Sequence, residues 1–339
     1  MKILVTGGCG FIGSNYIINQ IKNKNNIILN LDSLTYAGNP SNLNLIKNHK
    51  NYSFIEGSIC DPLCVNKTIE DFQPNAIVHF AAESHVDRSI DGPMTFINTN
   101  ILGTAVLLES SLKFWRDNKE FRFLHVSTDE VYGSLGKNGL FTERTPYNPS
   151  SPYSSSKASS DFLVKAWNRT YGFPSLITNC SNNYGPYQFP EKLIPLCILN
   201  ALQGKNLPIY GDGKQVRDWL YVLDHCKGIE LVLAKGKIGA TYNIGGSNEK
   251  TNIEVVHILC DLLDKIKPLK KGKSYKDQII FVGDRPGHDR RYAIDATKIT
   301  KDLGWKSDET FDTGIRETIQ WYIDNQEWVK NIKSGDYMK

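Results

Sequence analysis

Near its N-terminus the chain reads Lys2-Ile3-Leu4-Val5-Thr6-Gly7-Gly8-Cys9-Gly10-Phe11-Ile12-Gly13, a short β-rich run followed by three glycines spaced three apart. The residues from Ser14 to Lys22 then have the pattern of a helix. A strand, a Gly-x-x-Gly-x-x-Gly turn and a helix in succession are typical of a dinucleotide-binding site. The glycines let the backbone approach a pyrophosphate, and the helix N-terminus offers unpaired N–H groups to its phosphates. This stretch therefore predicts a Rossmann-like fold that binds a dinucleotide.

The residue after the second predicted strand indicates which dinucleotide is bound. That strand, Ile27 to Leu31, ends at Asp32, about 20 residues beyond the last glycine. A carboxylate there accepts hydrogen bonds from the adenosine ribose hydroxyls and repels a 2′-phosphate. No arginine follows closely, because the next residues are Ser33-Leu34-Thr35-Tyr36. The pattern favours NAD over NADP.

Strands and helices go on alternating through the first half of the chain. Further strands are predicted at 52–57, 76–82, 121–126 and 175–180, and helices at 61–72, 95–115 and 153–171. Such a series predicts an α/β fold with a doubly wound parallel sheet, whose site lies at the carboxyl ends of the strands. The polar stretches Glu83-Ser84-His85, Thr128-Asp129-Glu130 and Asn182-Asn183 all follow predicted strands, so we expect them to meet at that edge.

After about residue 181 proline and glycine become frequent and the pattern loosens. Helical stretches remain at 191–203, 219–235, 252–266 and 311–330, and a strand is predicted at 241–246. We expect an NAD-binding domain over 1–180 and a smaller α/β substrate domain over 181–339. A segment at about 219–245 is a candidate to return to the first domain, and the residues after about 331 are expected to form a loose tail.

Composition is that of an ordinary globular protein. Apolar residues make up 40% of the 339 residues, and the net charge of +4 is too small to indicate a nucleic-acid partner. None of the seven cysteines forms a Cys-x-x-Cys pair, so we interpret them as reduced and mostly buried, with no zinc site. No apolar run approaches the length of a membrane span, and we expect no signal peptide, because the first strand follows Met1 directly and runs into the glycine turn. We expect a cytoplasmic protein with neither a metal nor a membrane partner.

Tyr153 and Lys157 are the first candidate catalytic pair. They are four residues apart on a predicted helix, so they lie on one face, one turn from each other. An ammonium beside a phenol lowers the pKa of the phenol, which would let Tyr153 take a proton from a substrate hydroxyl near neutral pH. An exposed helical pair would have the same spacing. The Asp129-Glu130 pair at the end of the preceding strand gives the motif its weight.

Several stretches together resemble the extended short-chain dehydrogenase/reductases that act on nucleotide sugars. They are Gly7 to Gly13, Ala81 to Ser89, Ser127 to Gly133, and Tyr153 with Lys157. Those at 178–187, 190–195, 217–222 and 284–292 narrow the resemblance to the 4,6-dehydratases of this family, with dTDP-glucose as the implied substrate. The resemblance covers almost the whole chain. It implies bound NAD and a two-fold homodimer that pairs the helices at about 95–115 and 153–171.

The resemblance also implies a reaction cycle that fits these residue types. The C5 hydrogen of a hexose is not acidic, but oxidising C4 to a ketone makes it so. Tyr153 with Lys157 would take the C4 hydroxyl proton as NAD takes the C4 hydride, and Thr128 would hydrogen-bond that oxygen. Glu130 would remove the C5 proton, Asp129 in its acid form would protonate the leaving C6 hydroxyl, and the hydride would return to C6. Two adjacent carboxyls can divide these roles only if their surroundings separate their pKa values.

The same resemblance implies which residues contact the two ligands, and Arg217 and Arg285 suit bidentate phosphate contacts. The expected cofactor contacts are Gly7, Gly10, Phe11, Ile12, Gly13, Asp32, Ser33, Leu34, Thr35, Ser58, Ile59, Phe80, Ala81, Ala82, Ser84, Thr99, Tyr153, Lys157 and Asn183. The expected substrate contacts are Ser84, His85, Thr128, Asn182, Lys192, Leu193, Pro208, Ile209, Tyr210, Arg217, Asn252, Asp284, Arg285, His288 and Tyr337.

The chain departs from the family pattern in three places. Ser58 stands where the family usually has an aspartate near the adenine, which puts one adenine contact in question. The segment between Gly133 and Phe141 is short, so the rim of the site is not defined. The chain stops soon after Tyr337, which weakens an expected C-terminal contact.

Three other functions are alternatives to the dehydratase. A nucleotide-sugar 4-epimerase does not need the carboxyl pair and a UDP-glucuronate decarboxylase keeps only the glutamate, so Asp129 discriminates against both. A catalytically silent NAD-binding regulator would have lost Tyr153, Lys157 or the acid pair, and all are present. The residues alone leave the nucleobase open among thymidine, uridine and cytidine.

Overall fold

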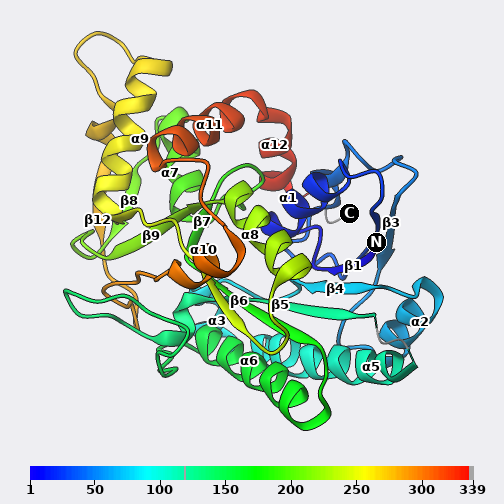
Figure 1. Cartoon of the computed structure of the whole chain (residues 1–339). Helices are drawn as coiled ribbons and strands as arrows, with labels where there is room; N and C mark the ends of the chain where they lie inside the picture. The colour runs from blue at the N-terminus through cyan, green and yellow to red at the C-terminus, as the bar shows by residue number, and fades with distance from the viewer. Residues whose placement is uncertain (118–119, 336–339) are drawn as a thin grey trace.

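The computed structural model describes residues 1–117 and 120–335 and is built around one parallel sheet (Figure 1). Its strand order, β10-β6-β5-β4-β1-β2-β3, reverses direction between β1 and β4. The seven strands are β1 (Lys2–Thr6), β2 (Ile27–Asp32), β3 (Tyr52–Glu56), β4 (Ala76–His79), β5 (Arg122–Thr128), β6 (Ser175–Cys180) and β10 (Thr241–Ile244). The central strands are buried throughout, as expected for parallel strands covered on both faces. The predicted doubly wound sheet is confirmed.

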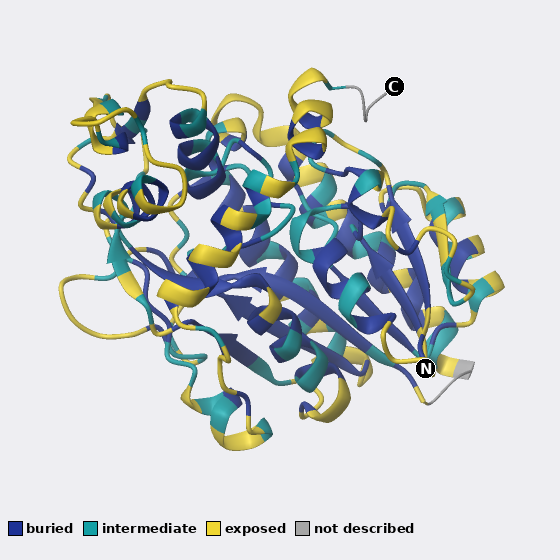
Figure 2. Cartoon of the chain, turned by 90° about the horizontal axis from the view of Figure 1, so that it is seen from above, coloured by how far each residue is buried: buried dark blue, intermediate teal, exposed yellow. Residues whose placement is uncertain are grey.

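Helices cover both faces of this sheet, and each face has its own apolar core. On one face lie α1 (Phe11–Gln20), α8 (Val222–Lys235) and α10 (Thr297–Leu303), above the sheet in Figure 1. On the other lie α2 (Pro62–Phe72), α5 (Thr104–Asp117) and α6 (Pro152–Tyr171). Figure 2 shows the sheet as a buried layer between them. The helix after the glycine turn begins at Phe11 rather than at the predicted Ser14.

The helix predicted as one piece over 95–115 is built differently. The chain forms α3 (Val86–Asp91), α4 (Pro93–Phe96) and a π-helical stretch η2 (Ile97–Gly103) before α5 begins. Gly92 has a non-helical backbone and Pro93 lacks the N–H that would continue α3, so the first break falls there. The helical path therefore begins earlier than its apolar pattern indicated, and it passes directly beside the site.

A second, smaller domain has its own core. It contains a three-stranded sheet, β11-β9-β7, and a parallel pair, β12-β8. Its strands are β7 (Asn182–Tyr184), β8 (Leu207–Tyr210), β9 (Val216–Tyr221), β11 (Glu249–Thr251) and β12 (Ile279–Val282). Its helices are α7 (Leu193–Leu202), α9 (Asn252–Ile266), α11 (Phe311–Asp324) and α12 (Gln326–Ser334). Short 3-10 turns complete the chain: η1 (Pro40–Leu43), η3 (Asp129–Tyr132) and η4 (Tyr275–Gln278).

Some predictions for this half of the chain are wrong in detail. Residues 219–221 end strand β9, and helix α8 begins only at Val222. The predicted helix at 311–330 is interrupted at Asn325, and α12 continues to Ser334 where a loose tail was expected. The Trp328 indole in α12 donates to Asn42 Oδ1 at 2.7 Å, which fastens this helix to the first domain. Strand β10 pairs with β6, whereas the boundary at 180/181 stays a prediction.

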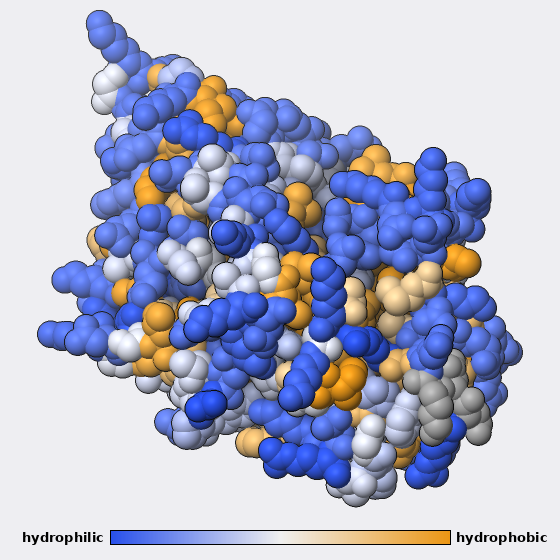
Figure 3. All heavy atoms as spheres, viewed as in Figure 1, coloured by the Kyte–Doolittle hydropathy of each residue, from blue (hydrophilic) through white to orange (hydrophobic). Residues whose placement is uncertain are grey.

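The outer surface is mixed in character. On the face drawn in Figure 3, hydrophilic residues predominate and apolar residues occur in small groups. In the described ranges no helix combines the length and the apolar composition that a bilayer span requires.

Candidate active site

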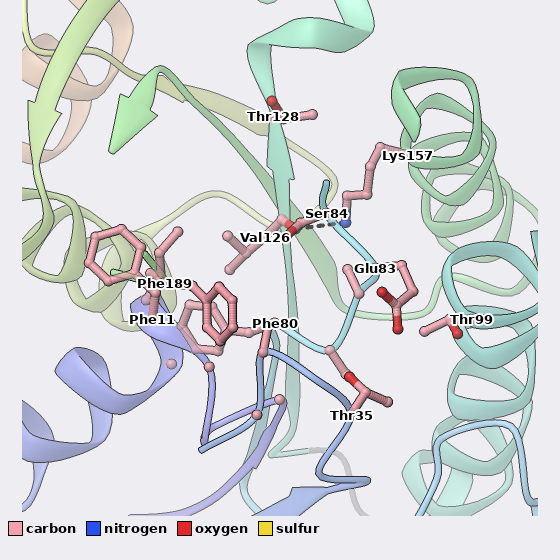
Figure 4. Close-up of a pocket in the computed structure, with 18 of the residues that line it drawn as sticks. Phe11, Thr35, Phe80, Glu83, Ser84, Thr99, Val126, Thr128, Lys157 and Phe189 are labelled. Atoms are coloured by element: carbon pink, nitrogen blue, oxygen red, sulfur yellow. Dashed lines mark hydrogen bonds between the residues drawn. The ribbon is translucent and has the colours of Figure 1, made fainter. Parts of the chain in front are cut away.

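A cavity of about 460 Å³ lies at the carboxyl ends of β1, β4, β5 and β6, where the strand order reverses. This is the edge at which open α/β sheets bind their ligands. It is lined by every predicted cofactor residue except Leu34, and also by Thr128, Asp129, Glu130, Asn182 and Lys192. In Figure 4, Phe11, Phe80 and Phe189 lie on one side of it and Glu83 and Thr99 on the other. The predicted catalytic residues and nearly all the predicted cofactor residues therefore line one cavity.

The glycine turn after β1 fits the pyrophosphate of a dinucleotide. Gly7 has a φ of +74°, and a Cβ there would lie 2.5 Å from the backbone nitrogen of Ala81. A Cβ on Gly13 would lie 2.4 Å from the Gly7 carbonyl oxygen, so both positions require glycine for packing. At Gly10 a Cβ would meet only the Gly7 carbonyl oxygen, at 3.4 Å. Gly10 instead leaves its backbone open toward the cavity, where a phosphate could approach.

Asp32 ends β2 as a buried carboxyl group within this cavity. Its Oδ2 accepts from the Cys9 backbone N–H at 2.8 Å, and its Oδ1 accepts from the Leu34 N–H at 2.9 Å. These two bonds fix the carboxyl group beside the turn, where it suits the ribose hydroxyls of NAD. Leu34 thus acts through Asp32 rather than by lining the cavity. Ser58 lines the cavity too, but its hydroxyl already accepts from the Cys60 N–H at 3.1 Å.

Helix α6 places Tyr153 and Lys157 on its inward face. A capping box between Ser151 and Ser154 fixes the start of the helix, and both predicted catalytic side chains are buried. Lys157 Nζ donates to the Val126 carbonyl oxygen at 3.0 Å, the dashed contact in Figure 4. Burial lowers the pKa of Lys157 to about 8.

The expected lowering of the Tyr153 pKa by Lys157 is not found. Burial raises the pKa of Tyr153 well above its ordinary value, and the charge of Glu130 raises it further. A hydrogen bond with Thr128 acts in the opposite direction but is outweighed. Burial explains the difference, because the sequence shows spacing along a helix but not how little water reaches the hydroxyl.

Thr128 and the two carboxyl groups form a tight turn at the end of β5. The Glu130 backbone N–H donates to Thr128 Oγ1 at 3.3 Å, and that hydroxyl donates to Asp129 Oδ1 at 3.4 Å. Asp129 is 2% exposed, and its Oδ2 has no hydrogen-bond partner in the part of the chain that the structure describes. The sequence therefore folds so that a buried carboxyl oxygen is left for a ligand.

The surroundings separate the pKa values of the two carboxyl groups. Burial, then the charges of Glu130 and Asp218, raise the pKa of Asp129 well above its ordinary value. Burial also raises the pKa of Glu130, but three cations, Arg285, Arg217 and Lys192, pull it back down. The pKa of both carboxyl groups is raised, but only Glu130 faces cations that favour its ionised form.

These cations come from three distant segments of the second domain. Lys192 Nζ donates to the Ser84 carbonyl oxygen at 3.3 Å. Arg285 Nη1 contacts Asp87 Oδ1 at 3.0 Å, and the buried Arg217 guanidinium lies 4.3 Å from the centre of the Tyr292 ring. Their shared influence on Glu130 places positive charge next to the catalytic turn, where a diphosphate could bind.

The other predicted substrate residues do not line the cavity, and Ile209 is buried in the core of the second domain. His288 Nδ1 contacts Asp284 Oδ1 at 2.6 Å, and the His288 ring lies 6.3 Å from the Tyr210 ring. Pro208 and Ile209 belong to β8, Leu193 begins α7 and Asn252 begins α9. His85 Nε2 lies 3.7 Å from Glu191 Oε2. Tyr337 falls outside the described residues.

Sequence reasoning missed several residues that line the cavity. Among them Glu191 contacts two other segments of the chain: it accepts from the Tyr36 hydroxyl at 3.0 Å and lies 3.4 Å from Arg88 Nε. It stands directly before Lys192 in a stretch that the sequence already singled out, so its position was a usable signal. The other missed residues are Leu31, Ala37, Gly38, Gly57, Glu83, Val126, Ser127, Cys180, Ser181, Gln188 and Phe189.

Known proteins with the same features are numerous and similar along the whole chain. The family model described as GDP-mannose 4,6 dehydratase matches residues 4–318. A dTDP-glucose 4,6-dehydratase of Salmonella typhimurium is 59% identical over 351 residues, covering 99% of this chain and 97% of that protein.

Two solved structures extend the likeness to the fold. A dTDP-glucose 4,6-dehydratase from Bacillus anthracis in complex with NAD is 50% identical with a TM-score of 0.88, covering 98% of this chain and 99% of the other. The corresponding enzyme from Streptomyces venezuelae, also solved with NAD, is 45% identical with a TM-score of 0.89, covering 97% and 98% of the two chains. The chain therefore belongs to the nucleotide-sugar 4,6-dehydratase family of extended short-chain dehydrogenase/reductases, among the dTDP-glucose 4,6-dehydratases.

Proposed function

We propose that this chain converts dTDP-glucose into dTDP-4-dehydro-6-deoxy-glucose and water, as an NAD-dependent hydro-lyase. The observation that carries the proposal is the Asp129-Glu130 pair, whose pKa values the surroundings separate, in one cavity with Tyr153 and the glycine turn. An epimerase has no use for such an acid and base. The product is the kind of keto sugar from which rhamnose-type deoxysugars are made.

NAD is the cofactor, and the residues around the glycine turn fit it. Gly10 would face the pyrophosphate and Asp32 the adenosine ribose. When bound, NAD supplies the acceptor for the C4 hydride, its donor to C6, and a positive charge on the nicotinamide ring that favours a phenolate nearby. Because the hydride is returned within each turnover, retention of NAD between turnovers suits the chemistry.

Tyr153 is the base of the oxidation step. It takes the proton of the C4 hydroxyl, while the Thr128 hydroxyl donates a hydrogen bond to the same oxygen. The pKa of Tyr153 is raised by burial, so proton acceptance depends on positive charge nearby. Lys157 supplies that charge from the same helix face, held by the Val126 carbonyl.

Glu130 and Asp129 divide the elimination between them. Once C4 is a ketone, Glu130 takes the C5 proton, and the electron pair forms the C5–C6 double bond as the C6 hydroxyl leaves. Asp129 gives its proton to that hydroxyl, so water is released. Return of a hydride to C6 and of a proton to C5 from Glu130 completes the sugar, and Asp129 is then reprotonated from solvent.

The cations of the second domain bind the diphosphate of the substrate in this proposal. Arg217 and Arg285 present guanidinium groups that suit bidentate phosphate contacts, and Lys192 adds a third charge. Asp87 now contacts Arg285 at 3.0 Å, so the diphosphate would take the place of that carboxylate. The sugar would then lie toward Thr128, Asp129 and Glu130.

Incubation of the purified protein with dTDP-glucose tests this function. A 4-keto-6-deoxy product, identified by mass spectrometry as the loss of one water, is the expected result. UDP-glucose and CDP-glucose at the same concentration are the controls for the nucleobase. Conversion of dTDP-glucose into its 4-epimer without loss of water would refute the dehydratase and favour an epimerase.

We also propose that the protein forms a homodimer with two-fold symmetry. Helices α5 and α6 pack against each other on the same face of the sheet (Figure 1). Apolar side chains in α6 and in η2, which leads into α5, stay exposed. Leu102 is 54% exposed in η2 and Phe162 is 57% exposed in α6. Pairing of these helices between two copies would bury both.

Light scattering on the purified protein at micromolar concentration tests the dimer. A mass of twice the chain is expected, and Phe162→Glu should shift it toward the monomer. Leu63→Glu, at an apolar position 80% exposed on α2, is the matched control and should stay dimeric. A monomeric wild-type protein would contradict the assignment.

The location is assigned to the cytoplasm. All seven cysteines are free thiols, and five of them are buried, which suits a reducing compartment. Fractionation of cells that express the protein should recover it with the cytoplasmic markers, and recovery with the envelope would contradict this.

A further inference from the structure

Asp161 is a buried carboxylate on the same helix as the catalytic pair. Tyr153, Lys157 and Asp161 follow one another at intervals of four residues, so they lie along one face of α6. Asp161 has no exposed surface, and it does not line the cavity. A carboxylate that is taken out of water destabilises a fold unless charges and hydrogen bonds compensate it. Its neighbours therefore indicate why it is there.

Each oxygen of Asp161 faces a polar partner. Oδ2 accepts from the Tyr147 hydroxyl at 2.8 Å and from Asn179 Nδ2 at 3.3 Å. Oδ1 lies 3.3 Å from His125 Nε2. Burial raises the pKa of Asp161, but hydrogen bonds from His125 and Tyr147 and the charge of Lys157 outweigh it and hold the pKa below its ordinary value. Asp161 is thus a fixed negative charge inside the protein.

His125 lies between this charge and Lys157. Its Nε2 is 3.3 Å from Asp161 Oδ1 and 3.4 Å from Lys157 Nζ. Burial lowers the pKa of His125 to about 4, so its ring is neutral and carries one N–H. The same Nε2 lies 3.2 Å from Ser160 Oγ, so His125 touches Asp161, Lys157 and Ser160 through one ring nitrogen. His125 is therefore the neutral group that lies between the carboxylate and the ammonium.

Lys157 depends on this arrangement for its charge. Burial favours the neutral amine, whereas the negative charge of Asp161 favours the ammonium. The other titratable groups that face Lys157 offer no second anion: Tyr153 on the same helix, His125 on β5, His79 on β4 and Cys180 on β6. The two histidines are neutral, and burial raises the pKa of the Cys180 thiol. Asp161 is the buried counter-charge of the catalytic lysine.

We propose that Asp161 is a positioning residue for the oxidation step: its carboxylate, acting beside His125, keeps Lys157 charged and in place next to Tyr153. This inference rests on the proposed function, because the role of Lys157 comes from it. The sequence contained the signal, since Asp161 follows Lys157 by the same four residues that separate Lys157 from Tyr153.

The test measures oxidation apart from elimination. Asp129→Asn serves as the parent, because it removes the titration of Asp129 and lets enzyme-bound NADH accumulate. The rate of NADH absorbance growth after mixing with dTDP-glucose is recorded from pH 5.5 to 9 by stopped flow. Asp161→Asn, Asp161→Glu and Tyr147→Phe are each added to the parent. Melting temperature and bound nucleotide are measured for every variant to verify folding.

Asp161→Asn should move the pH above which oxidation fails downward by about one unit or more, because Lys157 loses its counter-charge. Asp161→Glu keeps the negative charge, so the pH above which oxidation fails should return most of the way to that of the parent. Tyr147→Phe removes a hydrogen bond to Asp161 but leaves the negative charge of Asp161. Its oxidation rate should therefore fall at the same pH as in the parent. A profile for Asp161→Asn that is only scaled down, with an unchanged midpoint, would overturn the inference. Absence of NADH in the parent at every pH would instead overturn the proposed function, and this inference with it.

Discussion

Asp129 and Glu130 carry the same functional group on adjacent residues, and their surroundings act differently on the two pKa values. The Asp129 side chain is almost fully buried and has two further carboxyl groups, Glu130 and Asp218, nearby. Glu130 faces Arg285, Arg217 and Lys192 instead. The sequence shows the pair, but the cations come from far along the chain. A difference between the pKa values of the two carboxyl groups could therefore be expected from the proposed chemistry. The cations that cause this difference are visible only in the structure.

The raised pKa of Asp129 has a consequence for stability. The folded protein must keep this carboxyl protonated, whereas the unfolded chain releases the proton above its ordinary pKa of about 3.9. Stability is thus lost as pH rises from that value toward the raised pKa. Asp129→Asn cannot ionise, so it should be more stable than the wild type at pH 8, with the difference shrinking toward pH 5.

Urea unfolding at pH 5, 6.5 and 8 checks this expectation. Asp91→Asn, at an exposed aspartate in α3, is the control for the substitution itself. A stability difference for Asp129→Asn that stays constant from pH 5 to 8 would show that the carboxyl is not held protonated by the fold.

At the scale of elements, the strands could be predicted because buried parallel strands are continuous apolar runs. The helical path from Val86 to Gly103 could not be predicted in the same way. The break at Gly92-Pro93 and the π-helical stretch interrupt the 3.6-residue spacing of apolar residues that indicates an α-helix. Contacts between loops could not be predicted from the sequence either. Tyr36 and Glu191 are 155 residues apart, and no local pattern indicates that their side chains meet.

Glu191 fastens three segments around the NAD cavity. It accepts from Tyr36 in the loop after β2 and pairs with Arg88 in α3, whose guanidinium lies 3.8 Å from the centre of the Tyr36 ring. Partly buried contacts of this kind contribute roughly 1 kcal/mol together. We expect Glu191→Ala to release bound NAD roughly fivefold faster, since opening the loops becomes easier.

Exchange of bound NAD against labelled NAD, followed by rapid filtration, measures the release rate. Asp308→Ala removes a more exposed ion pair, with Lys227, and serves as the matched control. Equal exchange rates in wild type and Glu191→Ala would show that this contact does not retain the cofactor.

At the scale of the whole molecule, the site needs both domains. The first contributes the predicted NAD-binding residues and the turn from Thr128 to Glu130, and the second contributes Lys192, Arg217 and Arg285. Motifs predicted the members of both groups, because each lies in a distinctive stretch. They could not show that Arg285 contacts Asp87 or that His288 contacts Asp284, since those contacts depend on how two cores pack against each other.

The protein should also be sensitive to mild acid. Burial keeps His225 neutral with a pKa of about 3, and it holds the pKa of His125 at about 4. The unfolded chain protonates both below about 6.5, so stability is complete above that pH and is lost as pH falls toward the folded values. Each such histidine contributes about 1.4 kcal/mol of loss per pH unit.

Urea unfolding of the wild type and of His225→Gln at pH 7.5, 6.5 and 5.5 isolates this contribution, because the raised pKa of Asp129 acts on both proteins in the opposite direction. Between pH 6.5 and 5.5 His225→Gln should lose less stability than the wild type, whereas His257→Gln, at an exposed histidine of α9, is the control. Equal losses in the wild type and His225→Gln would count against a buried neutral His225.

The central claim is that oxidation and elimination use different residues of one cavity. Stopped-flow absorbance with dTDP-glucose, beside mass spectrometry of the sugar in deuterated water, reads both steps in the same variants. Tyr153→Phe should form no NADH, because it removes the base for C4. Glu130→Gln should still form NADH but lose about 10²–10⁴-fold in product and in C5 deuterium exchange.

Asp129→Asn supplies the decisive comparison in that measurement. It should accumulate enzyme-bound NADH and exchange deuterium at C5, while loss of the C6 oxygen slows, because only the acid for the leaving hydroxyl is missing. If Asp129→Asn and Glu130→Gln both turn over at nearly the wild-type rate, the pair does not perform the elimination and the account is wrong.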